Sequence, residues 1–200
     1  MRSSDDLPAN PWPQDMQVGV EESWPPLTFL LFVRSTWHLP IDDVPRLDAD
    51  PEPGSSNRPE NLDVDSAVRR WLSEWRRAWT HFDLPNSTVS SPDEETQHLL
   101  DTLTDDELWE ATATRPSDFW DSGIDHDAYY RWQSTMAARL GELPESRVVP
   151  ALVAAWRDGL RTIIQLPMAG FVAHRINRAH LVVSTATRRD PDRYSQALTL

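Results

Sequence analysis

The stretch LRTIIQL at residues 160–166, together with LVVST at residues 181–185, decides the fold class of this chain. Both segments are short and rich in Ile, Val, Leu and Thr, a composition typical of β-strands. Residues 167–170 (PMAG) predict a turn, so we expect residues 160–166 to pair with residues 171–176 as a hairpin. Because the alternation of apolar and polar residues is irregular, a helix over residues 170–179 is the alternative.

A third apolar stretch, LTFLLFV at residues 27–33, predicts a buried strand, with a helical turn as the alternative. Residues 1–60 around it hold 10 of the 17 Pro residues, which remove backbone donors and shorten regular elements. We therefore expect a Pro-rich irregular arm over residues 1–60 with one apolar strand-like segment, followed by a single globular α+β domain over residues 61–200. Residues 48–61, rich in Pro, Ser and Gly, predict a mobile loop.

Residues 63–82 have the clearest helical pattern, with apolar residues at spacings of three and four. Its Trp71, Trp75 and Trp79 predict a core-facing stripe, and an aromatic binding wall is the alternative. Capping residues predict further helices, which start near Ser91, Thr104, Asp125, Ser146 and Asp190. The expected fold is α+β, with four or five helices packed on a small antiparallel sheet formed mainly by the C-terminal third.

Charge is divided unevenly along the chain. The formal net charge is −13, but residues 1–145 carry 29 acidic residues against 11 Arg, whereas residues 146–200 carry 8 Arg against 3 Asp. An acidic chain argues against nucleic acid and anionic membrane as partners, because both require cationic surfaces. The absence of Cys and of an apolar leader, with a composition rich in Arg, Ala, Asp and Pro, predicts a soluble cytoplasmic bacterial protein.

No sequence motif marks a catalytic or cofactor site. The chain has no Lys for a phosphate-binding loop and only six Gly, so no nucleotide cofactor is expected. The His spacing fits no metal motif, and no metal is expected. Weak acid–base candidates are His126, His174 and His180. The candidate anion-binding residues are Arg161, Arg175, Arg178, Arg188 and Arg189.

These tail arginines have two interpretations. They converge on a small anion, or they neutralise the acidic body within the fold, and the second is favoured because that body offers so many carboxylates. The sequence therefore predicts a non-catalytic binding or regulatory module that acts through protein contacts. The alternative is an enzyme with a dispersed Arg/His site for a small anionic substrate. An acidic mimic of nucleic acid is a weaker third hypothesis.

Overall fold

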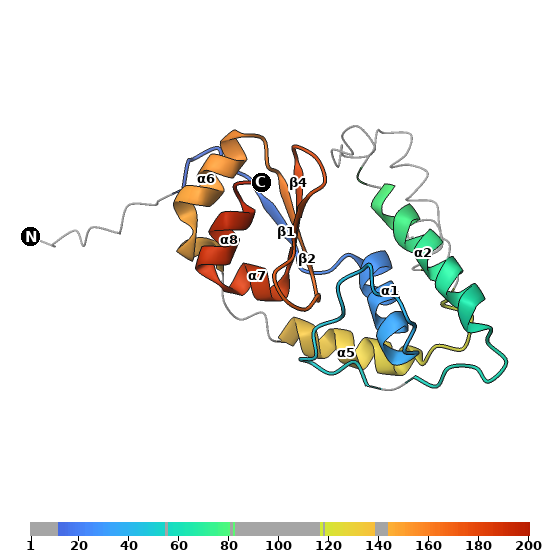
Figure 1. The fold of residues 1–200 in the computed structure, drawn as a ribbon. Coiled ribbons are helices and arrows are strands. Elements are labelled where there is room, and N and C mark those ends of the chain that lie inside the picture. Colours follow the sequence, from blue (N-terminus) through green and yellow to red (C-terminus); the bar gives the residue numbers. More distant parts are fainter. Residues whose placement is uncertain (1–11, 55, 81, 83–116, 118, 139–143) are drawn as a thin grey trace, which may run out of the picture.

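The sheet is mixed and has four strands (Figure 1). The computed structural model describes residues 12–54, 56–80, 82, 117, 119–138 and 144–200. The strands are β1 (Gly19–Glu21), β2 (Thr162–Leu166), β3 (Ala173–Arg175) and β4 (His180–Ser184), in the order β1-β2-β4-β3. The described residues hold six α-helices, more than the four or five expected. The α+β class and the location of most strands in the C-terminal third are confirmed.

The expectation of an antiparallel sheet is wrong for two of the three strand pairs. β1 and β4 both run parallel to β2, and only β3 and β4 are antiparallel. The expected hairpin is also wrong, because β3 pairs with β4 and lies at the sheet edge instead of pairing with β2. β2 and β4 are each buried at four consecutive positions. Strands that are covered on both faces lack a regular alternation of apolar and polar residues, so the irregular alternation in the sequence is typical of this geometry.

Each face of the sheet packs against its own helical layer (Figure 1). Ile163, Leu181 and Val183 belong to a hydrophobic cluster with α6 (Val149–Arg157) and α8 (Pro191–Ala197). Ile164 and Val182, from the alternate positions, belong to a second cluster with α1 (Pro25–Thr36) and α2 (Val64–Thr80). The sheet is thus the middle layer between two helical layers.

The predicted strand at residues 27–33 is a helix. α1 begins with Pro25 and Pro26, which suit the first helical positions because their missing N–H groups have no partner there. Every residue from Leu27 to Arg34 is buried. A helix that is buried on all sides shows no amphipathic period, so a short apolar run in sequence does not distinguish it from a buried strand.

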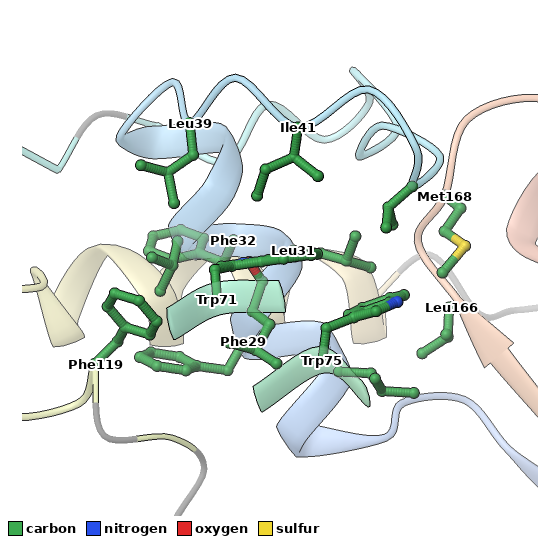
Figure 2. Packing of buried hydrophobic residues seen from close by; sticks show 14 of the residues in the cluster. Phe29, Leu31, Phe32, Leu39, Ile41, Trp71, Trp75, Phe119, Leu166 and Met168 are labelled. Atoms are coloured by element: carbon green, nitrogen blue, oxygen red, sulfur yellow. The ribbon is translucent and has the colours of Figure 1, made fainter. Parts of the chain in front are cut away.

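α2 confirms a helix over most of residues 63–82 and the burial of Trp71 and Trp75, whereas Trp79 is half-buried at the border of the core. Trp71 is fully buried and stacks on Trp75, with ring centroids 5.0 Å apart. The indole Nε1 of Trp71 donates to the carbonyl oxygen of Leu30 in α1 at 2.6 Å. Figure 2 shows both indoles directed into the core beside Phe29 and Leu31 of α1.

Two of the remaining helices begin at their predicted caps, Asp125 and Asp190. The start predicted near Ser146 is wrong, because α6 begins after Val148, which makes no side-chain cap. The cap at Ser184 was not among the predictions. Asp125 accepts from the backbone N–H of Ala128 at the start of α5 (His126–Ala138). A 3₁₀ turn, η2 (Pro144–Arg147), precedes α6. Ser184 caps α7 (Thr185–Arg189), and Asp190 caps α8. The helices expected near Ser91 and Thr104 lie outside the described residues.

Residues 48–61, predicted as a mobile loop, contact α5 at two points. The indole Nε1 of Trp132 donates to the carbonyl of Pro51 at 3.1 Å, and the backbone N–H of Asp125 donates to the Oγ of Ser56 at 2.9 Å. Ser56 is buried. The division into an arm and a domain stays a prediction. Across the described residues, no helix has the length and apolar character needed to cross a bilayer.

Candidate functional site

A cavity of about 370 Å³ lies at the end of the sheet where the three parallel strands finish. Glu22 and Ser23 follow β1, Gln165 and Pro167 lie at the end of β2, and Thr185 follows β4; all five line the cavity. The crevice beyond the carboxyl ends of parallel strands is a common position for ligands in α/β sheets, because loops diverge there and leave space. We refer to it as the carboxyl-edge cavity.

Helix α5 and the loop at residues 48–51 form the opposite wall of the cavity. α5 contributes Gln133, Ser134 and Met136, and the loop contributes Asp48, Asp50 and Pro51.

The loop is attached to the sheet through its backbone. The N–H of Asp48 donates to the carbonyl of Pro167 at 2.8 Å, and the N–H of Ala169 donates to the carbonyl of Arg46 at the same distance. An isolated bridge joins Leu47 to Met168 between them. The loop wall is therefore held in place by hydrogen bonds to the segment that follows β2.

A buried polar network lies next to the cavity and is centred on Arg188, whose side chain is 3% exposed. Its Nε and Nη2 donate to the two carboxylate oxygens of Glu145 at 2.8 and 3.1 Å. Its Nη1 donates to Gln165 Oε1 at 2.8 Å and to Glu22 Oε1 at 3.3 Å. The hydroxyl of Tyr194 donates to Glu145 Oε1 at 3.0 Å. The network joins η2, α7, α8, β2 and the residue after β1.

The protonation of this network follows from burial and pairing. Burial alone would raise the pKa of Glu145, but hydrogen bonds and charge from Arg188 outweigh it and hold that pKa below its usual value. Burial opposes the charge of Arg188, yet its pKa is raised because Glu145 stabilises the cation. Burial and the neighbouring Glu145 charge raise the pKa of Tyr194. Arg188 and Glu145 are therefore an ion pair, and Tyr194 is a neutral donor.

The strand pattern and the cap at Ser184 place Arg188 in this position. Gln165 alternates with Ile164, so its side chain lies on the same sheet face as Ile163 and the α6–α8 layer. The Oγ of Ser184 accepts from the backbone N–H of Thr187 at 3.1 Å and begins α7 directly after β4. One turn of α7 then brings Arg188 over the end of β2.

The five predicted anion-binding arginines fall into two groups at opposite ends of the strands. Arg188 and Arg189 follow the carboxyl end of β4, and only Arg189 lines the carboxyl-edge cavity. The other three lie near the amino ends of β2 and β4 and donate to backbone carbonyls; they are Arg161, Arg175 and Arg178. Anion binding by these residues stays a prediction.

None of the three candidate histidines lines the cavity. His126 stacks on Trp120 with centroids 4.2 Å apart, and its Nε2 lies 2.8 Å from the carbonyl of Trp120. His174 contacts the ring of Trp79. His180 lies against Phe82, with its Nδ1 2.9 Å from Asn177 Oδ1. The geometry does not bring these histidines together with Arg188 or Arg189.

Sequence reasoning missed Glu22, Glu145 and Tyr194. No motif connects positions this far apart in the chain. A weak signal was available at Gln165, a polar residue inside an otherwise apolar strand, because a buried amide requires a hydrogen-bond partner. Within the described part of the chain, no group of three or more His, Cys, Asp or Glu is arranged to hold a metal ion.

Comparison of the chain with protein-family models, curated proteins and solved structures found no match.

Proposed function

We propose that this chain is a non-catalytic binding module that acts through protein contacts, and that a group of the partner enters the carboxyl-edge cavity. The observation that carries this proposal is the cavity itself, formed where the three parallel strands end and backed by the Arg188 network. Fixed polar groups beside apolar wall residues are the usual composition of a recognition site. We propose the bacterial cytoplasm as its location on the grounds of composition.

The cavity supports binding more strongly than catalysis. Its ionisable lining residues in the described part of the chain are Glu22, Asp48, Asp50 and Arg189, and no histidine is among them. Acid–base catalysis requires a group within hydrogen-bond reach of the substrate, and the candidate histidines lie elsewhere, so catalysis here would have to use the carboxylates of Glu22, Asp48 or Asp50. An enzyme acting on a small anion stays the alternative, with Arg189 as the one predicted anion-binding residue in the cavity wall.

Filling the cavity tests the proposal. Ser134 is an exposed α5 residue that lines the cavity, so Ser134→Trp places a large ring in the space. Thr135→Trp is the matched control, because the neighbouring Thr135 is also exposed but does not line the cavity. Both variants and the unmodified chain are titrated with basic, acidic, polar and apolar tetrapeptides, and melting temperature is followed.

We expect at least one peptide class to raise the melting temperature saturably, by roughly 3 °C at ten times Kd. Thr135→Trp keeps this gain and Ser134→Trp loses it. Mass spectrometry of the incubated peptide should recover it unchanged. The proposal fails if no class stabilises the chain or if both Trp variants respond alike. Turnover of the peptide would instead establish the enzyme alternative.

A further inference from the structure

We infer that the carboxyl-edge cavity receives a protonated alkyl amine, and that Glu22 is the carboxylate that binds it. This inference rests on the function proposed above and names the chemistry of the group that enters. Two sources share that chemistry: a basic side chain of a partner protein and a free diamine. Three features of the cavity support it: its charge, the way Arg188 holds Glu22, and the apolar strip between the walls.

The cavity has an excess of negative charge. Among the described residues, Glu22, Asp48 and Asp50 line it, against the guanidinium of Arg189. Behind the wall, Arg188 adds one positive charge, but Glu145 takes two of its nitrogen donors. A concave site with low-dielectric walls concentrates its field and attracts ions of opposite sign. A ligand that neutralises the negative charge of these walls is therefore positively charged.

Arg188 orients Glu22 without neutralising it fully. The bidentate contact of Arg188 is with Glu145, whereas Glu22 accepts only from Nη1, at 3.3 Å. That Nη1 also donates to Gln165, at the shorter distance of 2.8 Å. Of the hydrogen bonds that Arg188 donates to these side chains, the one to Glu22 is therefore the longest and weakest. The side chain of Glu22, which lines the cavity, is 41% exposed. A carboxylate that is fixed in place and still open to the cavity is suited to accept from an ammonium group.

The rest of the lining suits an alkyl chain. Met136, Pro51 and Pro167 contribute apolar surface to the same cavity as the carboxylates. Long amines lay their methylene groups along apolar surface while the charged end contacts polar groups. This combination favours a flexible amine such as a lysine side chain or a diaminoalkane over a small inorganic cation, which would gain nothing from the apolar strip.

The test compares charge and source in one calorimetric titration. The probes are 1,4-diaminobutane, its neutral isostere 1,4-butanediol, and a capped lysine tetrapeptide with its Nε-acetylated form. Glu22→Gln removes the charge but keeps an oxygen for Arg188. Glu21→Gln is the matched control, since it makes the same charge change one residue earlier, on an exposed side chain that does not line the cavity. Sodium chloride controls for ionic strength.

We expect saturable one-to-one binding of the amine probes and none of the diol or the acetylated peptide. Glu22→Gln should weaken amine binding at least fivefold, and Glu21→Gln less than twofold. Stronger binding of the lysine peptide identifies a partner side chain as the source, and stronger binding of diaminobutane identifies a free amine. The inference is overturned if the amines act only as sodium chloride does, or if both Gln variants lose binding equally.

Failure of this inference is distinguishable from failure of the proposed function. If an acidic or neutral probe binds and Ser134→Trp abolishes that binding, the cavity is a binding site and only its amine chemistry is wrong. If no probe of any charge binds to the unmodified chain, the proposed function fails as well.

Discussion

The guanidinium of Arg188 faces the carboxylate of Glu145 in a bidentate contact, with Nε 2.8 Å from Oε1 and Nη2 3.1 Å from Oε2. The two side chains are 3% and 13% exposed, so removing one partner leaves the other charged and poorly solvated. We predict that Arg188→Met lowers the free energy of unfolding by about 3–5 kcal/mol. The double variant Arg188→Met/Glu145→Gln should lose less than the sum of the single losses, because it leaves no unpaired buried charge.

Urea unfolding of the four proteins measures this coupling. Arg193→Met is the matched control, since Arg193 pairs with Asp190 at 3.5 Å on the surface and its loss should cost about 0–1 kcal/mol. Additive losses in the double variant would contradict a coupled pair.

The same pair predicts a dependence of stability on pH. Against the effect of burial, Arg188 holds the pKa of folded Glu145 below its ordinary value of 4.5. A carboxyl group with a lowered folded pKa adds stability above its unfolded pKa and loses it as pH falls through the folded value. The stability difference between the unmodified chain and Glu145→Gln should thus be largest near neutrality and shrink below about pH 4.5. Urea unfolding of both proteins from pH 7 to pH 3 measures this difference.

Features set by local sequence were predictable, whereas features set by burial or by distant contacts were not. The α2 helix and the caps at Asp125 and Asp190 were predictable because local spacing and hydrogen bonding determine them. α1 was not predictable, because burial on all sides removes the periodicity that distinguishes a helix. The parallel pairing of β2 with β4 depends on contacts distant in sequence, including the helices that cover both faces.

The candidate site was the least predictable part. Arg188 was singled out as a tail arginine, but its partners Glu22 and Glu145 lie in segments with no pattern of their own. The expectation that tail arginines neutralise the acidic body describes Arg188, which pairs with both of these carboxylates. It does not describe Arg161, Arg175 and Arg178, which donate to backbone carbonyls. Charge counting along the sequence does not separate these two arrangements.

Truncation of the α2 stripe should be costly. Trp75 is 9% exposed and packs between Trp71 and Trp79. We predict that Trp75→Ala lowers the free energy of unfolding by about 3–5 kcal/mol, because it removes a large ring and leaves a cavity. Arg76→Ala on the exposed side of the same helix should change it by less than about 0.5 kcal/mol. Thermal and urea unfolding measure the stability of both variants. An unchanged melting temperature for Trp75→Ala would contradict the prediction and favour the alternative that the Trp stripe is a binding surface.

Arg34 should support the loop that carries one wall of the cavity. Its side chain lies in α1, is buried, and donates to the carbonyls of Ile41, Val44 and Pro45. We predict that Arg34→Met costs at least about 2 kcal/mol, because it leaves the buried carbonyls of Ile41 and Val44 without partners. Arg34→Lys should recover only part of the loss, since one ammonium group cannot reproduce the planar fork. Arg46→Met, at an exposed arginine of the same loop, serves as the control in urea unfolding, and equal losses at both positions would contradict this role.

The last prediction concerns anions. Arg175 donates to the carbonyls of Asn177 and Arg178 at 3.0 and 2.6 Å, and Arg178 donates to that of Asp158 at 2.7 Å. In an empty anion site the guanidinium groups would repel one another. The hydrogen bonds to backbone carbonyls reduce this repulsion between Arg175 and Arg178. We therefore expect sulfate to give no saturable gain in melting temperature beyond chloride at equal ionic strength, only the gradual stabilisation that excluded salts give to folded proteins. Arg178→Gln should lower the free energy of unfolding by about 0.5–1.5 kcal/mol through the lost hydrogen bond.

A saturable gain in sulfate beyond that in chloride would contradict this expectation, because mass action requires a bound anion. Two variants would then locate the anion. Loss of the gain in Arg178→Gln would assign it to the amino ends of β2 and β4, near Arg161 and Arg175. Loss in Arg189→Gln would assign it to the carboxyl-edge cavity. The second result would also reverse the expected sign of the ligand there, since a site that holds sulfate does not prefer an amine.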